Sequence, residues 1–317
     1  MNCNHAYIMT KTTISSVCRL FRWRPVIAWG VVSIMIAVAC AVESGRGIDW
    51  INLLLVGLTI LIIQGIIAHG VNDLADEDVD RIAPIDETGR SKVLVSGEMS
   101  RRSMFAITSA AVLAVFLLVI LLWMRAGAYT LLFAGIAAYA VFGYSTKPLR
   151  LGWRPFSELF VVVPAIVAMI CGVEYVLISE VTQLAFIMGL SYGFFNASWF
   201  MYSRAQDYEA DKELGKRTTI VKFGLDTTPV FAQAYMAMSC MCTIYTAVVV
   251  EWYTVAAIFS ACAISAIAYV TEIRGAVTNP VPATYARLRI QGMKYATIYG
   301  VYASSAIVIF GVILWTI

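Results

Sequence analysis

The sequence predicts an all-α membrane protein with about nine transmembrane helices. Of its 317 residues, 60% are hydrophobic and only 14% are charged, whereas about a quarter of the residues in a soluble globular protein are charged. Apolar runs of about 20 residues, the length that crosses a bilayer as a helix, recur along the whole chain. Between these runs the basic residues fall almost entirely into alternate connections, as they do in proteins that cross a membrane several times.

The apolar runs place the expected helices in order. Residues 1–24 precede the first run and are predicted to be a cytoplasmic N-terminal segment, without the features of a signal peptide. Residues 25–317 are predicted to form one transmembrane domain. Its expected spans are 25–43, 51–71, 104–124, 127–144, 157–178, 182–203, 229–250, 252–271 and 295–317.

The Lys and Arg residues assign a side of the membrane to each connection. With nine spans, 21 of the 23 basic residues lie on one side, and only Arg46 and Arg125 lie on the other. Cytoplasmic connections are enriched in Lys and Arg, so we expect a cytoplasmic N-terminus and a C-terminus on the opposite side. The two long charged connections, about 72–103 and 204–228, then face the cytoplasm. The partner that this composition predicts is the lipid bilayer, with no nucleic acid.

The first long connection opens with an acidic cluster. The stretch VNDLADEDVD, from Val71 to Asp80, places five carboxylates within ten residues directly after an apolar span. Asn72, Asp76 and Asp80 are spaced four apart, and Asp73 lies three residues before Asp76. A helix that continues past the membrane surface would carry these side chains as one polar stripe.

The second long connection carries a similar cluster, in the stretch RAQDYEADKELGKRTT. Asp207 and Asp211 are again four residues apart. Carboxylates on two helix ends suit Mg²⁺, which binds through a few carboxylates together with substrate phosphates. The competing interpretation is a solvated acidic loop, which explains one such run better than two runs on the same face with the same spacing.

The two clusters together resemble the signatures of the UbiA superfamily of intramembrane prenyltransferases. The stretch from Asn72 to Asp80 is similar to the first signature, N-D-x-x-D-x-x-x-D, and the stretch DYEADKELGKRTT from Asp207 to Thr219 is similar to the second. The resemblance implies a bundle of helices around a central cavity, with both signatures at its cytoplasmic mouth. It also implies that Mg²⁺ holds the diphosphate of an isoprenyl donor there. The metal ligands implied are Asn72, Asp76, Asp80, Asp207 and Asp211.

The same resemblance implies direct contacts to the diphosphate. Asn72 and Asp73 of the first signature are expected to contribute, and Arg22 resembles an Arg-Pro element that the family carries before its first span. Lys92 is a further candidate. It begins the stretch KVLVSG, where many members have Arg-Pro-Leu-x-Ser-Gly, so the charge is kept and the proline is lost.

A third stretch, YSTKPLRLGWRPFSELF, resembles the family's connection between its fourth and fifth spans. Lys147 and Arg154 in this stretch are expected to be catalytic, because cationic side chains stabilise an anionic leaving group. Tyr144, its first residue, is expected to belong to the same catalytic group. The competing interpretation of the basic residues is topological anchoring at the cytoplasmic face.

The activity implied is Mg²⁺-dependent transfer of a polyprenyl group from a prenyl diphosphate donor to a lipophilic acceptor. The second signature is similar to that of naphthoate-prenylating members, which favours an aromatic quinone precursor of the 1,4-dihydroxy-2-naphthoate kind. Ether-lipid formation on geranylgeranylglyceryl phosphate, and prenylation of other acceptors, stay open. A secondary transporter is the alternative from a different class, but transporters carry charges and helix breaks in mid-span, whereas these acids lie at span ends.

Overall fold

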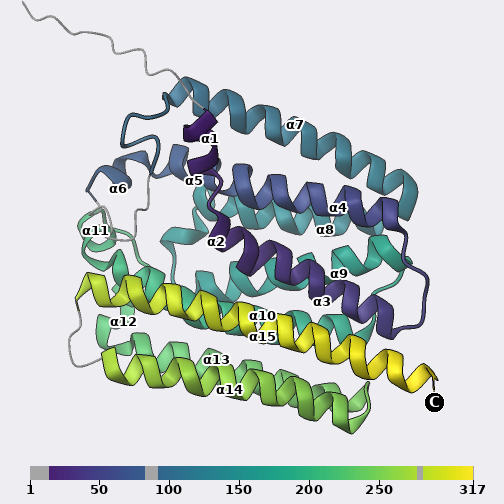
Figure 1. The fold of residues 1–317 in the computed structure, drawn as a ribbon. Helices are drawn as coiled ribbons and strands as arrows, with labels where there is room; N and C mark the ends of the chain where they lie inside the picture. Colours follow the sequence, from purple (N-terminus) through teal and green to yellow (C-terminus); the bar gives the residue numbers. More distant parts are fainter. Residues whose placement is uncertain (1–13, 83–91, 277–280, 317) are drawn as a thin grey trace, which may run out of the picture.

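The computed structural model describes residues 14–82, 92–276 and 281–316, and this part of the chain contains helices and no strand. The long helices run roughly side by side as one bundle (Figure 1). In chain order the helices are α1 (Ile14–Leu20), α2 (Trp23–Pro25), α3 (Val32–Glu43), α4 (Trp50–Ile62), α5 (Ala68–Ala75), α6 (Glu77–Ile82), α7 (Arg101–Ala126), α8 (Tyr129–Ala138), α9 (Val163–Ile178), α10 (Gln183–Gln206), α11 (Tyr208–Glu213), α12 (Thr219–Phe223), α13 (Thr228–Tyr245), α14 (Trp252–Ala276) and α15 (Pro282–Thr316).

Six helices of the described chain are long and apolar enough to cross a membrane. They are Trp23–Glu43, Trp50–Ala75, Arg101–Ala126, Glu158–Ile178, Gln183–Gln206 and Trp252–Gly275, where π-helical turns join the shorter helices into longer ones. The other three expected spans are also helical over their described residues, but the apolar helix Tyr129–Gly143 is shorter, and α13 and α15 are not among the six. The all-α membrane architecture is therefore confirmed, and the number nine stays a prediction.

Helix α10 lies at the centre of the bundle, where it packs against α9, α13 and α15. In its most apolar stretch 83% of the residues are buried, whereas in α7, at the periphery of the bundle, the corresponding share is 11%. Gly189 and Gly193 allow α10 to approach α9 closely, because a Cβ there would lie 3.1 Å from the Cα of Val167 and 3.2 Å from the Cα of Val163. Small residues one turn apart are a common basis of helix packing in membranes.

Helix α7 is attached to the bundle at both of its ends. Arg101 at its beginning forms an ion pair with Glu77 of α6. Arg125 at its end donates a hydrogen bond from Nη2 to Asp49 Oδ2 at 3.0 Å and one from Nε to Asn52 Oδ1 at 2.6 Å. The middle of α7 is largely exposed, as is expected for a helix that faces lipid.

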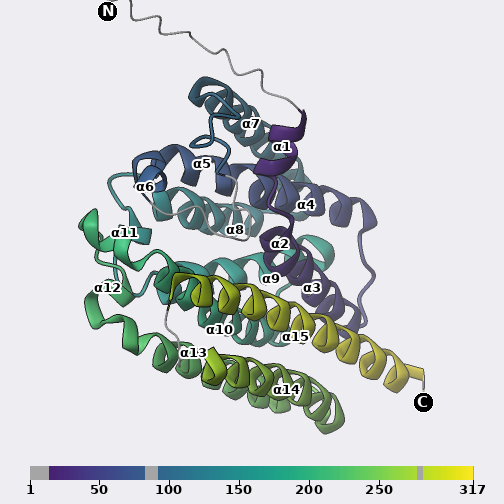
Figure 2. The same ribbon diagram turned by 60° about the vertical axis from the view of Figure 1, so that its left-hand side comes forward.

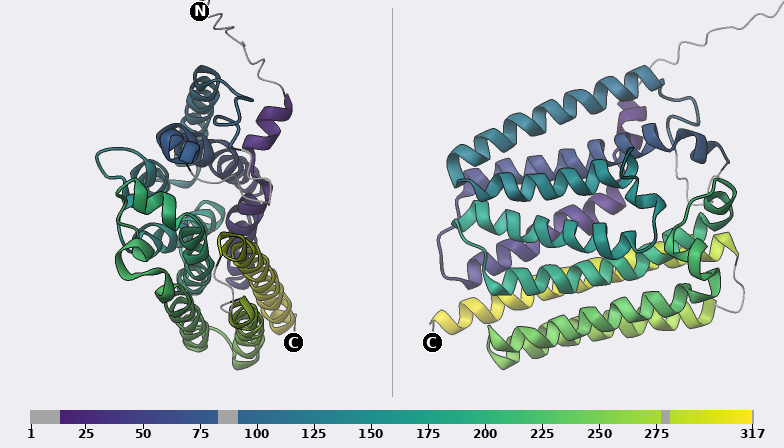
Figure 3. Two further views of the ribbon diagram at one scale, coloured as in Figure 1. Left: turned by 90° about the vertical axis from the view of Figure 1, so that its left-hand side faces the viewer. Right: turned by 180° about the vertical axis from the view of Figure 1, so that it is seen from behind.

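The short helices α6, α11 and α12 gather at one end of the bundle, on the left in Figure 1 and turned toward the viewer in Figure 2. The left panel of Figure 3 looks onto this end, and both further views keep the three helices together. Helix α6 contacts α11, although the two are more than 120 residues apart in the chain. The C-terminal end of α15 lies at the other end of the bundle (Figure 1). Both acidic clusters therefore lie at the same end.

Candidate active site

Each acidic cluster lies where a long helix breaks. Asp76 separates α5 from α6 with φ −109° and ψ 19°, and Asp207 separates α10 from α11 with φ −94° and ψ 10°. Both lie near the sparsely populated bridge region of the backbone map, where many active-site residues are found. The backbone hydrogen bonds from Asp80 N to Asp76 O (2.9 Å) and from Asp211 N to Asp207 O (2.8 Å) keep the four-residue spacing across each break. The expected polar stripe thus forms on an interrupted helix.

A cavity of about 550 Å³ opens between the helices at this end, and residues of both clusters line it. Along the long helix that contains α5 the lining extends from Gln64 to Asp80. Asp76 lies twelve positions after Gln64, which corresponds to about 18 Å of helix. The wall formed by α9 and α10 is mainly apolar, with Ile166, Met169, Trp199 and Phe200 among its residues. The cavity therefore combines a charged mouth with an apolar interior.

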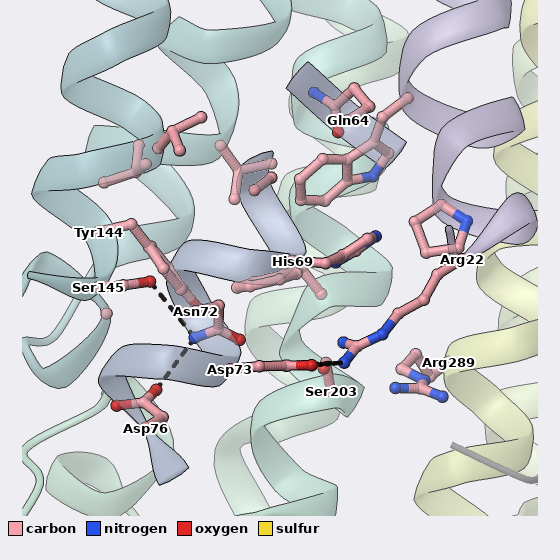
Figure 4. A pocket seen from close by; sticks show the side chains of 18 of the residues that line it. Arg22, Gln64, His69, Asn72, Asp73, Asp76, Tyr144, Ser145, Ser203 and Arg289 are labelled. Carbon is pink, nitrogen blue, oxygen red and sulfur yellow. Dashed lines mark hydrogen bonds and ion pairs between the residues drawn. The ribbon is translucent and has the colours of Figure 1, made fainter. Parts of the chain in front are cut away.

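Asp76 accepts hydrogen bonds from two neighbouring side chains. Asn72 Nδ2 donates to Asp76 Oδ2 at 3.1 Å and lies 3.3 Å from Ser145 Oγ, as Figure 4 shows. Trp153 Nε1 donates to the other carboxylate oxygen, Oδ1, at 3.3 Å. These contacts fix the carboxylate of Asp76 at the mouth of the cavity.

Lys216 joins the first cluster to the second. Its Nζ lies 2.9 Å from Asp211 Oδ1 and 3.9 Å from Asp76 Oδ2, and its side chain is only 5% exposed. Gly215 makes this position possible, because its φ of +71° turns the chain sharply at the end of α11. The backbone N–H of Lys216 then donates to Asp211 O at 2.9 Å. A carboxylate from each acidic cluster therefore lies within reach of one cation.

Two further carboxylates of the first cluster, Asp73 and Asp80, have basic partners. Arg22 Nη2 lies 2.7 and 2.9 Å from the two oxygens of Asp73, a contact drawn in Figure 4. Lys92 forms an ion pair with Asp80. Burial raises the pKa of Asp80 to about 6, and the neighbouring Lys92 ammonium opposes that rise in part. The structure thus brings the expected diphosphate contacts Arg22 and Lys92 to the cavity, each paired with an acid of the first signature.

The oxygen ligands at the mouth are of the kind that Mg²⁺ prefers. Among the described residues no three carboxylate, His or Cys side chains converge on one point. The acids alone therefore do not form a complete metal-coordination site. One oxygen is nevertheless left open: Asp211 Oδ2 is buried and accepts no hydrogen bond within the described part of the chain. Burial also raises the pKa of Asp211. A buried carboxylate oxygen without a donor is costly, and a divalent cation at this position would relieve that cost.

Tyr144 is oriented by a buried group that sequence reasoning did not single out. Its hydroxyl accepts a hydrogen bond from Arg204 Nη2, and Arg204 Nε lies 3.9 Å from Glu158 Oε1. Glu158 is fully buried, and its other oxygen, Oε2, accepts a hydrogen bond from Thr219 Oγ1 at 2.8 Å. The signal for Arg204 was its place three residues before Asp207, but a basic residue there also satisfies topology.

Lys147 and Arg154, which we expected to be catalytic, are exposed and do not line the cavity. Trp153 contacts Asp76 from the same connection, whereas its neighbour Arg154 is exposed. Lys216 and Arg204, by contrast, line the cavity beside the clusters, as Arg22 and Lys92 do. A catalytic role for Lys147 and Arg154 stays a prediction.

A second group of basic residues lies on another side of the cavity. Figure 4 shows Arg22 and Arg289 on one side, with Asn72, Asp76 and Tyr144 on the other. Arg24 and Arg289 both line the cavity; Arg289 belongs to α15. The cavity is therefore lined by arginines from the N-terminal segment and from α15 in addition to the two acidic clusters.

Comparison with solved structures shows where this fold has been seen. A UbiA homologue from Archaeoglobus fulgidus, bound to DMAPP and Mg²⁺, has a TM-score of 0.66 at 19% identity, covering 92% of this chain and 99% of that one. A UbiA homologue from Aeropyrum pernix K1 in its apo form gives 0.62 at 16% identity, over 90% and 98%. A digeranylgeranylglyceryl phosphate synthase gives 0.59 at 16% identity, over 94% and 98%. No curated protein matches the chain.

The fold and the site define an integral membrane protein: a helical bundle with a charged cavity at one end. The model of the UbiA prenyltransferase family matches residues 31–298, most of the sequence. The chain belongs to the UbiA prenyltransferase family, and the resemblance drawn from the two acidic signatures is confirmed.

Proposed function

We propose that this protein transfers a prenyl group from a prenyl diphosphate to a lipophilic acceptor, and that the reaction depends on Mg²⁺ and takes place in this cavity. The observation that carries the proposal is the meeting of Asp76 and Asp211 at Lys216. It puts both acidic clusters at the mouth of a cavity whose interior is apolar. Solved relatives of the same fold bind DMAPP or GPP together with Mg²⁺, which supports this donor class.

The residues of the cavity have distinct parts in the proposed reaction. The oxygen ligands that would hold Mg²⁺ are Asn72, Asp76, Asp80, Asp207 and Asp211. Bound Mg²⁺ would neutralise the diphosphate oxygens as the bond to the allylic C1 breaks. Arg204 and Lys216 add positive charge beside that leaving group. Trp199 and Phe200 line the cavity, where aromatic faces stabilise a developing carbocation and the apolar wall excludes water.

For the acceptor we propose an aromatic quinone precursor that carries a carboxylate, of the 1,4-dihydroxy-2-naphthoate kind. The support is that Arg24 and Arg289 both line the cavity, with Arg289 across from Asn72 and Asp76 in Figure 4. An anionic group on the acceptor would be attracted to these arginines, while the aromatic ring would face the prenyl group. An ether-lipid precursor with a phosphate group would use the same arginines, so the experiment must include both acceptors.

The test is a transfer assay with the purified protein. Geranylgeranyl diphosphate is offered with a panel of acceptors that includes 1,4-dihydroxy-2-naphthoate and geranylgeranylglyceryl phosphate, and products are identified by mass spectrometry while pyrophosphate release is measured. We expect Mg²⁺-dependent release with the naphthoate, lost on addition of EDTA. A prenylated glycerol phosphate as sole product would replace the proposed acceptor, and ion-coupled uptake into vesicles without pyrophosphate release would favour a transporter.

The site assignment is tested by two substitutions in the same assay. Asp76→Ala and Asp207→Ala are each expected to reduce turnover by at least about 100-fold, because each removes an oxygen ligand from the diphosphate-binding site. Glu209→Ala is the matched control, since Glu209 lies on the neighbouring turn and is exposed. Full turnover in both Asp variants would show that the reaction does not use these clusters.

A further inference from the structure

Lys216 occupies the point where the two acidic clusters meet. Asp211, its nearer partner, is only 1% exposed, and Asp76 is 13% exposed. The ammonium also lies 5.2 Å from the centre of the Trp153 ring, and Trp153 itself donates a hydrogen bond to Asp76. Lys216 is therefore enclosed by the same side chains that position the carboxylates.

This position conflicts with binding of a divalent cation by itself. An Mg²⁺ ligand oxygen lies about 2.0–2.1 Å from the metal, so a metal held by Asp76 and Asp211 would lie within a few ångströms of the ammonium. Repulsion between like charges at that distance is strong wherever water is excluded. Yet without Lys216 or a metal, two carboxylates at the mouth would have no cation between them. Lys216 and a bound metal would therefore each supply the positive charge that lies between the two carboxylates.

We propose that Lys216 stands in for the metal in the metal-free protein. It holds Asp76 and Asp211 together, opposes Mg²⁺ that arrives alone, and moves to a diphosphate oxygen when Mg²⁺ arrives with the prenyl diphosphate. The inference rests on the proposed function, because it takes the diphosphate as the new partner of the ammonium. Its consequence is that Mg²⁺ and donor each strengthen the binding of the other.

The charge of Lys216 can be removed while its length is kept, in the variant Lys216→Met. The full-length protein in detergent is stripped of metal and titrated with MgCl₂ by calorimetry, with and without geranylgeranyl diphosphate. Wild type is expected to bind Mg²⁺ weakly alone and more tightly with the donor. Lys216→Met is expected to bind Mg²⁺ alone about tenfold more tightly than wild type, with little further gain from the donor.

Two further variants separate charge from shape. Lys216→Arg keeps the positive charge and is expected to keep weak binding of Mg²⁺ alone. Lys212→Met is the matched control, because Lys212 lies four residues earlier, in the last turn of α11, and is exposed, and its ammonium lies 5.7 Å from the centre of the Tyr208 ring. It should behave as wild type in every titration.

Thermal unfolding gives a second readout that does not depend on turnover. In EDTA, Lys216→Met should unfold at a lower temperature than wild type, because removal of one partner leaves buried carboxylates without a countercharge. Added MgCl₂ should raise its midpoint by more than it raises that of wild type. If the variant folds only with metal, the MgCl₂ concentration that keeps it folded is measured instead.

The outcomes distinguish the two proposals. If Lys216→Met binds Mg²⁺ alone no more tightly than wild type, or gains no more stability from it, the inference about Lys216 is wrong. If wild type fails to bind Mg²⁺ even with the donor present, the proposed function fails instead.

Discussion

Asp73 accepts two contacts from Arg22 Nη2, at 2.7 and 2.9 Å, and is only 2% exposed. Its carboxylate is therefore neutralised by a residue that lies 51 positions earlier in the chain, just before the first long helix. This pairing attaches the N-terminal helices to the first acidic cluster. The sequence placed both residues among the diphosphate contacts, and the structure adds that they contact each other.

The pair makes a prediction about stability. Arg22→Gln is expected to lower the free energy of unfolding by about 3–5 kcal/mol, because it leaves the buried charge of Asp73 unpaired. The double variant Arg22→Gln with Asp73→Asn should recover part of that loss, since the charge is then removed with its partner. Both are measured by thermal unfolding in detergent.

The matched control for this prediction is Arg19→Gln. Arg19 forms an ion pair with Glu98, but the two side chains are 46% and 30% exposed, so the loss should stay within about 1 kcal/mol. The single variant Asp73→Asn completes the comparison. If the loss in the double variant equals the sum of the losses in the two single variants, Arg22 and Asp73 do not stabilise each other.

Among the helices, α9 and α10 approach each other closely. Gly193 lies against the backbone of Val163, and a Cβ added to this glycine would lie 3.2 Å from the Val163 Cα. The π-helical turn that leads into α9 begins at Glu158. The Oε1 atom of Glu158 lies 3.9 Å from Nε of Arg204, which belongs to α10. The spacing between these two helices therefore also determines where Tyr144 and Arg204 lie at the cavity.

Gly193→Leu is expected to push α9 and α10 apart. Overpacking of this kind costs about 1–3 kcal/mol, and it should also lower turnover, because the apolar wall of the cavity is formed by these two helices. Stability is measured by thermal unfolding and turnover by pyrophosphate release. Gly135→Leu is the control, since nothing lies within 4 Å of a Cβ at that position. Equal effects of the two substitutions would contradict this account of the packing.

The order of the helices could be predicted from the sequence, because length and hydropathy are properties of a segment by itself. The acidic clusters could be predicted as one site for a similar reason: both follow spans that end on the same side. The breaks at Asp76 and Asp207 could not, since a spacing of four residues is the same with or without a break. Lys216 was seen as part of a signature, but its position depends on the turn at Gly215.

The basic residues were the hardest to interpret from the sequence. Each of them fits the positive charge expected of a cytoplasmic connection, so the distribution of charge does not distinguish Lys147 from Lys216. Only the folded chain shows that Lys147 is exposed and that Lys216 is buried between two carboxylates. Trp153 had no signal at all, because its role depends on a contact with Asp76 from a different part of the chain.

At the scale of the whole molecule, the segregation of Lys and Arg predicts that the cavity mouth faces the cytoplasm. The prediction is tested with single cysteines in a background that lacks the native ones. Glu209→Cys should react with a membrane-impermeant maleimide only from the cytoplasmic side of oriented vesicles, and Arg46→Cys only from the other side. Both positions are exposed. Labelling of both from the same side would contradict the predicted topology.

Helix α7 is 26 residues long, which corresponds to about 39 Å of helix, whereas the hydrocarbon core of a bilayer is about 30 Å thick. A helix of this length tilts to match the thickness of the lipid around it. At its two ends Arg101 forms an ion pair with Glu77, and Arg125 forms one with Asp49. Glu77 directly follows Asp76 in the chain. A change in lipid chain length should therefore alter the position of Asp76, the carboxylate that we propose as a ligand of the donor's Mg²⁺, although no lipid needs to enter the cavity.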